Sequence, residues 1–90
     1  MKPAADILER ARSDFAKDDL ARAVELLGTY SGPEKARVLR CALHLSGGTL
    51  EQLEYFMHAA QVDYRDVILF AEYDVDNRRV RDFSQGFEDL

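Results

Sequence analysis

The fold is decided by the central stretch from residue 31 to residue 60, which reads SGPEKARVLRCALHLSGGTLEQLEYFMHAA. Apolar residues recur at helical spacing on both sides of the pair Gly47-Gly48, which is a strong helix stop signal. Thr49 and Gln52 have capping-box spacing and mark the start of the second helix. We therefore expect an antiparallel helical hairpin with a short turn. Its buried faces contain Val38, Leu39, Ala42, Leu43 and Leu45 in the first helix, and Leu50, Leu53, Phe56, Met57 and Ala60 in the second.

Two shorter helices are expected before this hairpin. Their apolar faces would point in opposite directions on one unbroken helix, so a break is predicted near residues 17–19. Asp18 is predicted to cap the second helix, and Gly28 to end it in the left-handed conformation. Ser31 and Glu34 form another capping-box pair, which predicts the start of the third helix. The two faces consist of Ile7, Leu8, Ala11 and Phe15, and of Leu20, Ala23, Val24 and Leu27.

A fifth segment is expected to start at Asp63, which has the spacing of a cap with Asp66 as an acid in the first turn. The apolar run of residues 67–71 covers more than one helix face, which leaves Leu69 and Phe70 off the core side. A helix is expected, with a buried strand as the alternative. From Asp74 onward the chain is polar, although Val80, Phe83, Phe87 and Leu90 recur at helical spacing.

These patterns predict an all-α fold, a compact bundle of four or five short helices around the central hairpin. Residues 1–74 are expected to form a single helical domain. Residues 75–90 are expected to form a polar C-terminal tail or a docking segment. The expected core comprises Leu8, Phe15, Leu20, Val24, Leu27, Val38, Leu39, Leu43, Leu50, Leu53, Phe56, Ala60, Val67 and Ile68.

Composition and charge favour a folded protein that does not bind polyanions. The chain has 90 residues, of which 47% are hydrophobic and 32% charged, and its net charge is −5. Such a charge repels nucleic acid and anionic lipid, so nucleic-acid binding is not expected and no membrane interaction is expected. Cys41 is the single cysteine, which fits a reducing compartment and a cytoplasmic location. Neither a signal peptide nor a membrane-spanning stretch is expected.

No catalytic residue, cofactor or metal site is expected. Cys41 and His44 are three residues apart, and Glu54 and His58 are four apart, but both histidines fall on outer helix faces and no paired metal motif is present. A cysteine nucleophile would also need an orienting group and a cleft, which so small a helical chain rarely provides. The protein is therefore not expected to be an enzyme.

Arg37, Arg40 and His44 form a basic stripe on the third helix, opposite its apolar face. Guanidinium groups pair with carboxylates and phosphates, so this stripe is the alternative candidate for an anion-binding site. The competing interpretation is an ordinary solvated helix face.

An apolar surplus outside the predicted core indicates a partner surface. Aromatic residues are enriched at protein interfaces because they bury a large area with little loss of rotamer freedom. The competing interpretation is that the bundle or the C-terminal residues cover these side chains. The candidate partner-binding residues are Tyr55, Leu69, Phe70, Tyr73, Phe83 and Phe87.

Several short motifs across the middle of the chain also suggest a relationship. They are residues 28–34 (GTYSGPE), Arg37-Val38, Arg40-Cys41, His44-Leu45, residues 63–67 (DYRDV) and residues 71–73 (AEY). As a set they resemble a family of small bacterial all-helical proteins of unassigned function, over about residues 28–74. The resemblance implies a bacterial, cytoplasmic protein, and it implies no catalytic residues.

The expected function is that of a small intracellular protein-interaction module, adaptor-like or regulatory, without catalytic activity. Its partner would be another protein or a second copy, so a homodimer is left open. The alternative is a nucleic-acid- or nucleotide-associated protein that uses the basic stripe. A further alternative is an acidic inhibitor of a nucleic-acid-binding protein, which would present carboxylates in place of phosphates.

Overall fold

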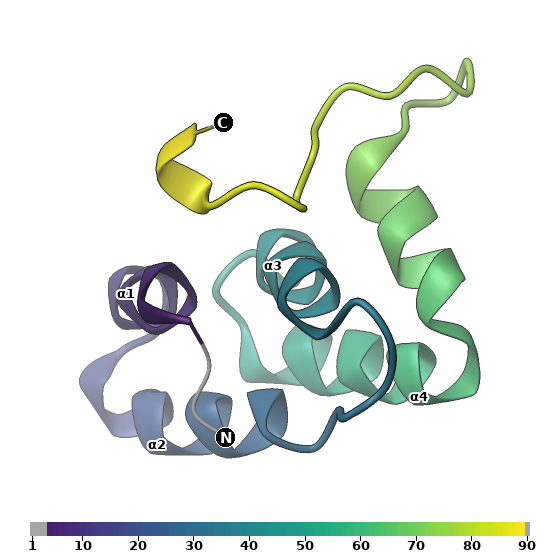
Figure 1. The fold of residues 1–90 in the computed structure, drawn as a ribbon. Helices are drawn as coiled ribbons and strands as arrows, with labels where there is room; N and C mark the ends of the chain where they lie inside the picture. Colours follow the sequence, from purple (N-terminus) through teal and green to yellow (C-terminus); the bar gives the residue numbers. More distant parts are fainter. Residues whose placement is uncertain (1–3, 90) are drawn as a thin grey trace.

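The predicted hairpin is formed by helices α3 (Lys35–Ser46) and α4 (Leu50–Glu72) in a computed structural model, which describes residues 4–89. The two helices pack closely against each other (Figure 1). Gly47 and Gly48 end α3 with φ angles of 59° and 83°, a backbone conformation that favours glycine. The Thr49 side chain then accepts a hydrogen bond from the Gln52 amide at 3.3 Å, so the predicted turn and cap are confirmed.

Helices α1 (Ala5–Asp14) and α2 (Lys17–Leu27) lie on one side of the hairpin (Figure 1). The only other helical element in residues 4–89 is η1 (Phe87–Asp89), a short 3₁₀ turn, and the described chain forms no β-sheet. The all-α class and the compact arrangement around the hairpin are thereby confirmed.

The fifth predicted segment is helical and forms the second half of α4. Asp63 interrupts this helix with non-helical angles, φ −155° and ψ 101°. Its carboxylate accepts a hydrogen bond from the Arg65 amide at 3.1 Å, which supports the restarted helix. In Figure 1 the second half of α4 rises steeply from the first half. The predicted break and helix are confirmed, and the alternative of a buried strand is wrong.

Three predicted helix ends are wrong in detail. The break after α1 falls at Phe15, whose side chain is buried, so α2 restarts directly after Ala16 and Asp18 lies inside its first turn without capping it. Gly28 ends α2 with a right-handed φ of −74°. Burial of Phe15 determines the first of these ends, which local spacing does not encode, while the Gly28 amide still bonds to the Val24 and Glu25 carbonyls of α2.

The capping box predicted for the third helix is also wrong. Helix α3 begins at Lys35, and its N-cap is Glu34 in the left-handed conformation, with no side-chain cap. The preceding turn is organised instead by Tyr30, whose buried hydroxyl donates to the Pro33 carbonyl at 2.6 Å. A local hydrogen bond from a tyrosine buried in the core therefore replaces the side-chain cap.

The core lies between all four helices and the C-terminal residues. Of the predicted core, eight side chains are buried, namely Phe15, Leu27, Val38, Leu39, Leu43, Leu53, Ala60 and Val67. Six are half-buried at its margin, namely Leu8, Leu20, Val24, Leu50, Phe56 and Ile68. Ten further hydrophobic residues are buried. Five of them lie on the predicted apolar helix faces, namely Ile7, Ala11, Ala23, Ala42 and Met57, and the others are Leu26, Tyr30, Cys41, Ala71 and Phe83.

Residues 73–89, here called the C-terminal segment, fold back over the helices. After a turn at the end of α4 they run past α3 and bring η1 beside α1 (Figure 1). Phe83 is completely buried and contributes to the core. The segment thus docks onto its own chain. Leu90, the last of the four apolar residues noted at helical spacing, lies outside the described residues.

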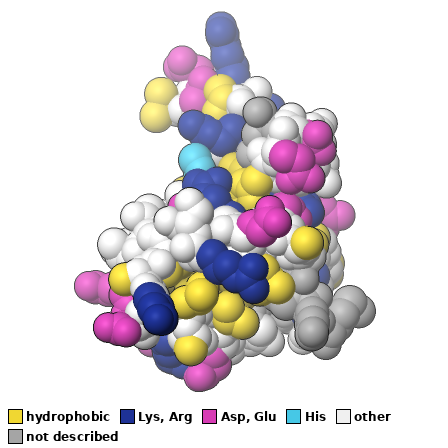
Figure 2. Space-filling view, turned by 90° about the vertical axis from the view of Figure 1, so that its left-hand side faces the viewer, with side chains coloured by type: hydrophobic (Ala, Val, Ile, Leu, Met, Phe, Trp, Pro, Cys, Tyr) yellow, Lys and Arg dark blue, Asp and Glu magenta, His cyan; other side chains and the backbone are white. Residues whose placement is uncertain are grey.

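The surface carries charges of both signs. On the face drawn in Figure 2, acidic and basic side chains are interspersed around apolar ones, so no field of a single sign covers this face. Among the described residues, no helix has the length and apolar character needed to cross a membrane.

Candidate functional site

An exposed apolar surface lies at the end of α4. We call it the α4 patch, and it consists of Leu69, Phe70, Tyr73 and Val75. Exposed fractions are 46% for Leu69, 59% for Phe70 and 98% for Val75, and Tyr73 is half-buried. Together with Asp74 and Asn77 these residues line a hollow of about 530 Å³. Contiguous exposed apolar side chains of this kind mark interaction sites.

The periodicity of α4 explains why the patch is exposed. Val67 and Ala71 are four residues apart on one face, and both are completely buried against the core. Leu69 and Phe70 lie between them in sequence and therefore on other faces of the helix. A run of consecutive apolar residues on a helix that buries only one face must leave part of its apolar surface in solvent.

A tight turn positions the remainder of the patch. The Asp74 carboxylate accepts hydrogen bonds from the Asp76 amide at 2.9 Å and from the Arg78 amide at 3.0 Å. The Asp74 amide donates to the Arg78 carbonyl at 2.9 Å, and Asn77 adopts the left-handed conformation with φ 60°. This side-chain capping is typical of aspartate in turns. It holds Val75 at the tip, where it is almost fully exposed.

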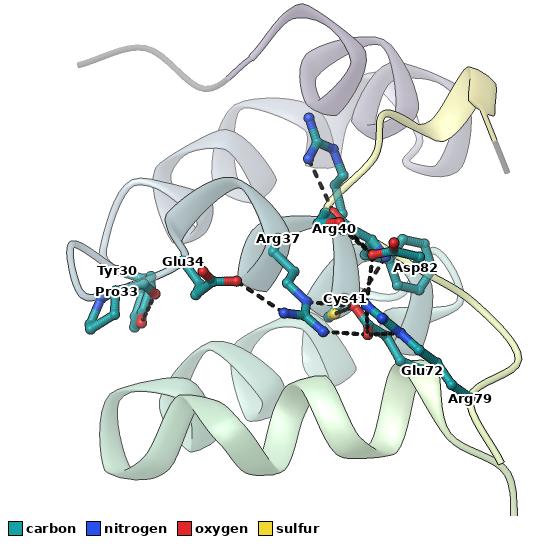
Figure 3. A network of polar contacts seen from close by, with 11 residues as sticks. Tyr30, Pro33, Glu34, Arg37, Arg40, Cys41, Glu72, Arg79 and Asp82 are labelled. Atoms are coloured by element: carbon teal, nitrogen blue, oxygen red, sulfur yellow. Dashed lines mark hydrogen bonds and ion pairs between the residues drawn. The ribbon is translucent and has the colours of Figure 1, made fainter.

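The turn is held in place by Glu72, the last residue of α4, which is completely buried. Arg37 of α3 donates to its carboxylate from Nε at 2.8 Å and from Nη2 at 2.6 Å (Figure 3). Arg79 Nε donates at 3.1 Å and the Phe83 amide at 3.0 Å. The Val80 amide donates to the Glu72 carbonyl at 2.7 Å. One residue therefore joins α3, α4 and the C-terminal segment.

The surroundings of Glu72 keep it ionised. Burial alone raises the pKa of a carboxyl, but the hydrogen bonds from Arg37 and from the Phe83 amide outweigh burial and hold the pKa of Glu72 below its ordinary value. The same pairing raises the pKa of Arg37. Because both charges are matched and hydrogen-bonded, this buried pair is stable only while both partners are present.

Cys41 lies beside this pair, with Sγ 3.9 Å from a Glu72 carboxylate oxygen. Burial, followed by the negative charge of Glu72, raises the pKa of the Cys41 thiol to about 12. The thiol is completely buried and protonated at neutral pH. It has neither the exposure nor the lowered pKa of a reactive cysteine.

A second ion pair ties α1 to α3. Arg40 donates to the Asp6 carboxylate from Nε at 2.8 Å and from Nη2 at 3.1 Å. Arg40 Nη1 donates to the Phe83 carbonyl at 3.1 Å, and the Phe87 amide donates to Asp6 at 3.1 Å. The hydrogen bond from Arg40 holds the pKa of Asp6 below its ordinary value. The C-terminal segment is thus anchored at Asp6 as well as at Glu72.

The predicted basic stripe is not a free surface. Arg37 and Arg40 pair with the internal carboxylates of Glu72 and Asp6, and Arg40 is buried. His44 lies half-buried with its ring 5.3 Å from that of Phe83. The stripe faces α1, α4 and the C-terminal segment, which pack around α3, so the competing interpretation of a solvated helix face is wrong.

The structure separates the six predicted partner-binding residues into three places. Leu69, Phe70 and Tyr73 stay together in the α4 patch. Tyr55 is 63% exposed on the first half of α4, where it lines another hollow with Leu26 and Met57. Phe83 was predicted as a partner contact but is completely buried in its own chain, and Phe87 is half-buried against the core. The break at Asp63 and the return of the C-terminal segment cause this separation.

Sequence reasoning missed Val75 and the role of Glu72. A signal for Glu72 exists, because it lies four residues after Ile68 and so on the inner stripe of α4, where an acid requires a buried partner. Val75 gives no such signal, since a single valine in a polar stretch is ordinary.

Residues 4–89 contain no group of three or more histidine, cysteine, aspartate or glutamate side chains that could hold a metal ion.

No protein-family model matches the chain, and neither a curated protein nor a solved structure matches it. The resemblance to small bacterial helical proteins therefore stays a prediction, and functional inference depends on the geometry.

Proposed function

We propose that this protein is a non-catalytic protein-interaction module whose α4 patch binds apolar side chains of a basic segment in another protein. The observation that carries the proposal is the cluster of Leu69, Phe70 and Val75, each at least 46% exposed, around one hollow. Exposed apolar clusters beside polar residues are typical of interaction sites. The buried, protonated Cys41 supports binding rather than catalysis, and a single free cysteine supports a cytoplasmic location.

The charges around the patch favour a basic partner. Asp74 lines the hollow, Asp76 follows Val75, and Asp66 lies one helical turn before Phe70. Within residues 4–89 none of these three acids forms an ion pair, and Arg78 is the cation of the same turn. Complementary charge steers association and selects partners.

The same charges disfavour a second copy as the partner. Two copies would each bring a net charge of −5 and the same acidic rim to the interface. Like charges placed opposite each other cost free energy and suppress such contacts. The patch is also small, which suits a transient complex better than an obligate dimer.

Photo-crosslinking tests the proposal. A benzoyl-phenylalanine side chain is placed at Phe70 in one variant and at Tyr55 in a control variant, because Tyr55 is an equally exposed aromatic on the other half of α4. After irradiation in cells, the variant at position 70 should crosslink to a protein segment that contains apolar and Lys or Arg residues, and the control should not. The double substitution Asp66→Lys and Asp76→Lys should weaken this crosslink.

Three outcomes would overturn the proposal. One is equal crosslinking from positions 55 and 70, which would indicate general adhesion. Another is crosslinking from position 70 to a second copy of the chain only. The third is a crosslink at position 70 that is unchanged by the two lysine substitutions, because a basic partner segment should respond to charge reversal at the rim.

A further inference from the structure

A second hollow, separate from the α4 patch, has the chemistry of an anion site. It has a volume of about 390 Å³ and is bounded by Arg10 of α1, His44 of α3, and Arg81 and Gln85 of the C-terminal segment. We propose that this Arg10–His44–Arg81 hollow binds the oxyanion group of a small molecule, a phosphate or a carboxylate. Guanidinium and imidazole groups from three elements converge there, which is the side-chain chemistry that recognises oxyanions.

The donors of this hollow are available. Arg10 uses Nε to bind Asp14 at 2.8 Å, while neither of its Nη groups forms a hydrogen bond within residues 4–89. Its guanidinium carbon lies 4.6 Å from the centre of the Phe87 ring, which orients the guanidinium plane. The Arg81 guanidinium makes a single 3.4 Å hydrogen bond, to the Ala71 carbonyl, and pairs with no carboxylate of the described chain.

The imidazole of His44 is also available. Its ring packs at 5.3 Å from Phe83, and neither nitrogen forms a hydrogen bond with another described residue. No buried polar side-chain atom in residues 4–89 lacks a partner, so these nitrogens reach solvent.

Asp82 and Asp89 line the hollow beside the two arginines. Arg10 pairs with Asp14, so Arg81 is the arginine of the lining that has no carboxylate partner among the described residues. Asp82 accepts hydrogen bonds from Arg79 at 2.7 Å and from the Ser84 amide at 3.0 Å, so its charge is already matched. Asp89 also lines the hollow, but it is exposed and therefore well solvated. The deeper arginines provide a contrast, since Arg37 and Arg40 each have a bidentate internal carboxylate.

The pKa of His44 supports a positive potential in the hollow. Burial lowers this pKa, Arg81 and Arg10 lower it further, and Asp14 opposes them. A bound oxyanion would offset the two arginines and raise the pKa of His44. Binding should consequently strengthen as the pH falls through that pKa.

The test is a titration of the full-length protein with inorganic phosphate and, separately, with acetate. Both are carried out at constant ionic strength with sodium chloride, while NMR follows the His44 imidazole and the arginine Nε groups. We expect a saturable shift and a higher His44 pKa in bound protein. A response to phosphate alone identifies a phosphate group as the ligand chemistry, and a response to acetate alone identifies a carboxylate.

Two matched arginine variants distinguish anion binding at this hollow from non-specific attraction of anions by surface arginines. Arg81→Gln should raise the Kd roughly tenfold or more, because a hydrogen bond to a charged group is lost. Arg78→Gln removes an exposed arginine of the same segment that does not line the hollow, and it should leave the Kd unchanged. The absence of a saturable shift with both anions, or an equal loss in the two variants, would overturn the proposal.

Discussion

At the scale of single residues, Glu72 determines how the C-terminal segment is attached. A buried carboxylate without partners would be protonated or would unfold the region. Here Arg37, Arg79 and three backbone amides of the C-terminal segment satisfy the side chain and carbonyl of Glu72. Such a pair stabilises one arrangement against others rather than adding much net stability, because both charges must be removed from water.

Replacing one partner of this pair should be costly. Glu72→Gln removes the buried negative charge and leaves Arg37 with only the exposed Glu34 as an ion-pair partner, so we expect a loss of about 3 kcal/mol in the free energy of unfolding. Urea denaturation measures this loss. The control is Glu51→Gln on an exposed part of α4, which should change stability by less than about 0.5 kcal/mol. Similar values for the two variants would contradict the role of Glu72.

Acid should destabilise the protein through Asp6 and Glu72. Both carboxyls have folded-state pKa values below their ordinary values of 3.8 and 4.5. Their contribution to stability is therefore present above those ordinary values and is lost as the pH falls through the folded-state values. Urea denaturation between pH 7 and pH 3 should show stability falling below about pH 4.5. Glu72→Gln should flatten this fall, and an unchanged slope would argue against Glu72 as a cause.

At the scale of elements, the turn between α3 and α4 shows the difference between local and tertiary constraint. Gly47 and Gly48 both have positive φ angles. A Cβ at Gly47 would meet no atom within 4 Å, whereas a Cβ at Gly48 would lie 2.7 Å from the Asp14 carbonyl oxygen. The first glycine ends a helix, and the second also lets the end of α1 approach the hairpin.

The two glycines should therefore respond differently to substitution. Gly47→Ala should cost about 1 kcal/mol of unfolding free energy through its left-handed backbone alone. Gly48→Ala should cost about 1–3 kcal/mol more, because the methyl group collides with α1. Thermal and urea denaturation of the pair provide the comparison. Equal losses would show that α1 moves away freely and that the close approach is unimportant.

At the scale of the whole molecule, the C-terminal segment completes the core. Phe83 is completely buried, and its amide and carbonyl are bound by Glu72 and Arg40. The segment is thus a structural part of the domain, and the hollow around Arg10, His44 and Arg81 exists only while it is docked. The α4 patch likewise depends on this segment, because the turn at its start carries Val75.

Substitution of Phe83 tests this dependence. Phe83→Ala should lower the free energy of unfolding by about 3–5 kcal/mol, since it leaves a cavity beneath the docked segment. Phe70→Ala, at a 59% exposed position of the same chain, should change it by less than about 0.5 kcal/mol. The measurement is urea denaturation of both variants. A Phe83 variant as stable as the Phe70 variant would mean that the segment contributes little to the fold.

The sequence by itself determined the elements and the central hairpin. Helical spacing of apolar residues, the Gly47-Gly48 stop and the Thr49 cap act over a few neighbouring residues, so they predict the helices, the turn and the break at Asp63. The same local counting identified Leu69, Phe70 and Tyr73 as surplus to the core. Local reasoning erred at Asp18 and Ser31, where burial of Phe15 and Tyr30 determines the helix starts. It also erred at Gly28, whose amide still bonds to carbonyls of α2.

Only the tertiary structure decided what the charged residues do. Whether Arg37 and Arg40 face solvent depends on where Glu72 and Asp6 arrive, and these acids are 35 and 34 residues away along the chain. The burial of Phe83 depends in the same way on how the C-terminal segment returns over α3. The separation of Tyr55 from Phe70 depends on the break in α4 at Asp63. Ion pairs and docking act between surfaces that spacing along the chain does not describe, because burial and distance exist only once the helices have packed.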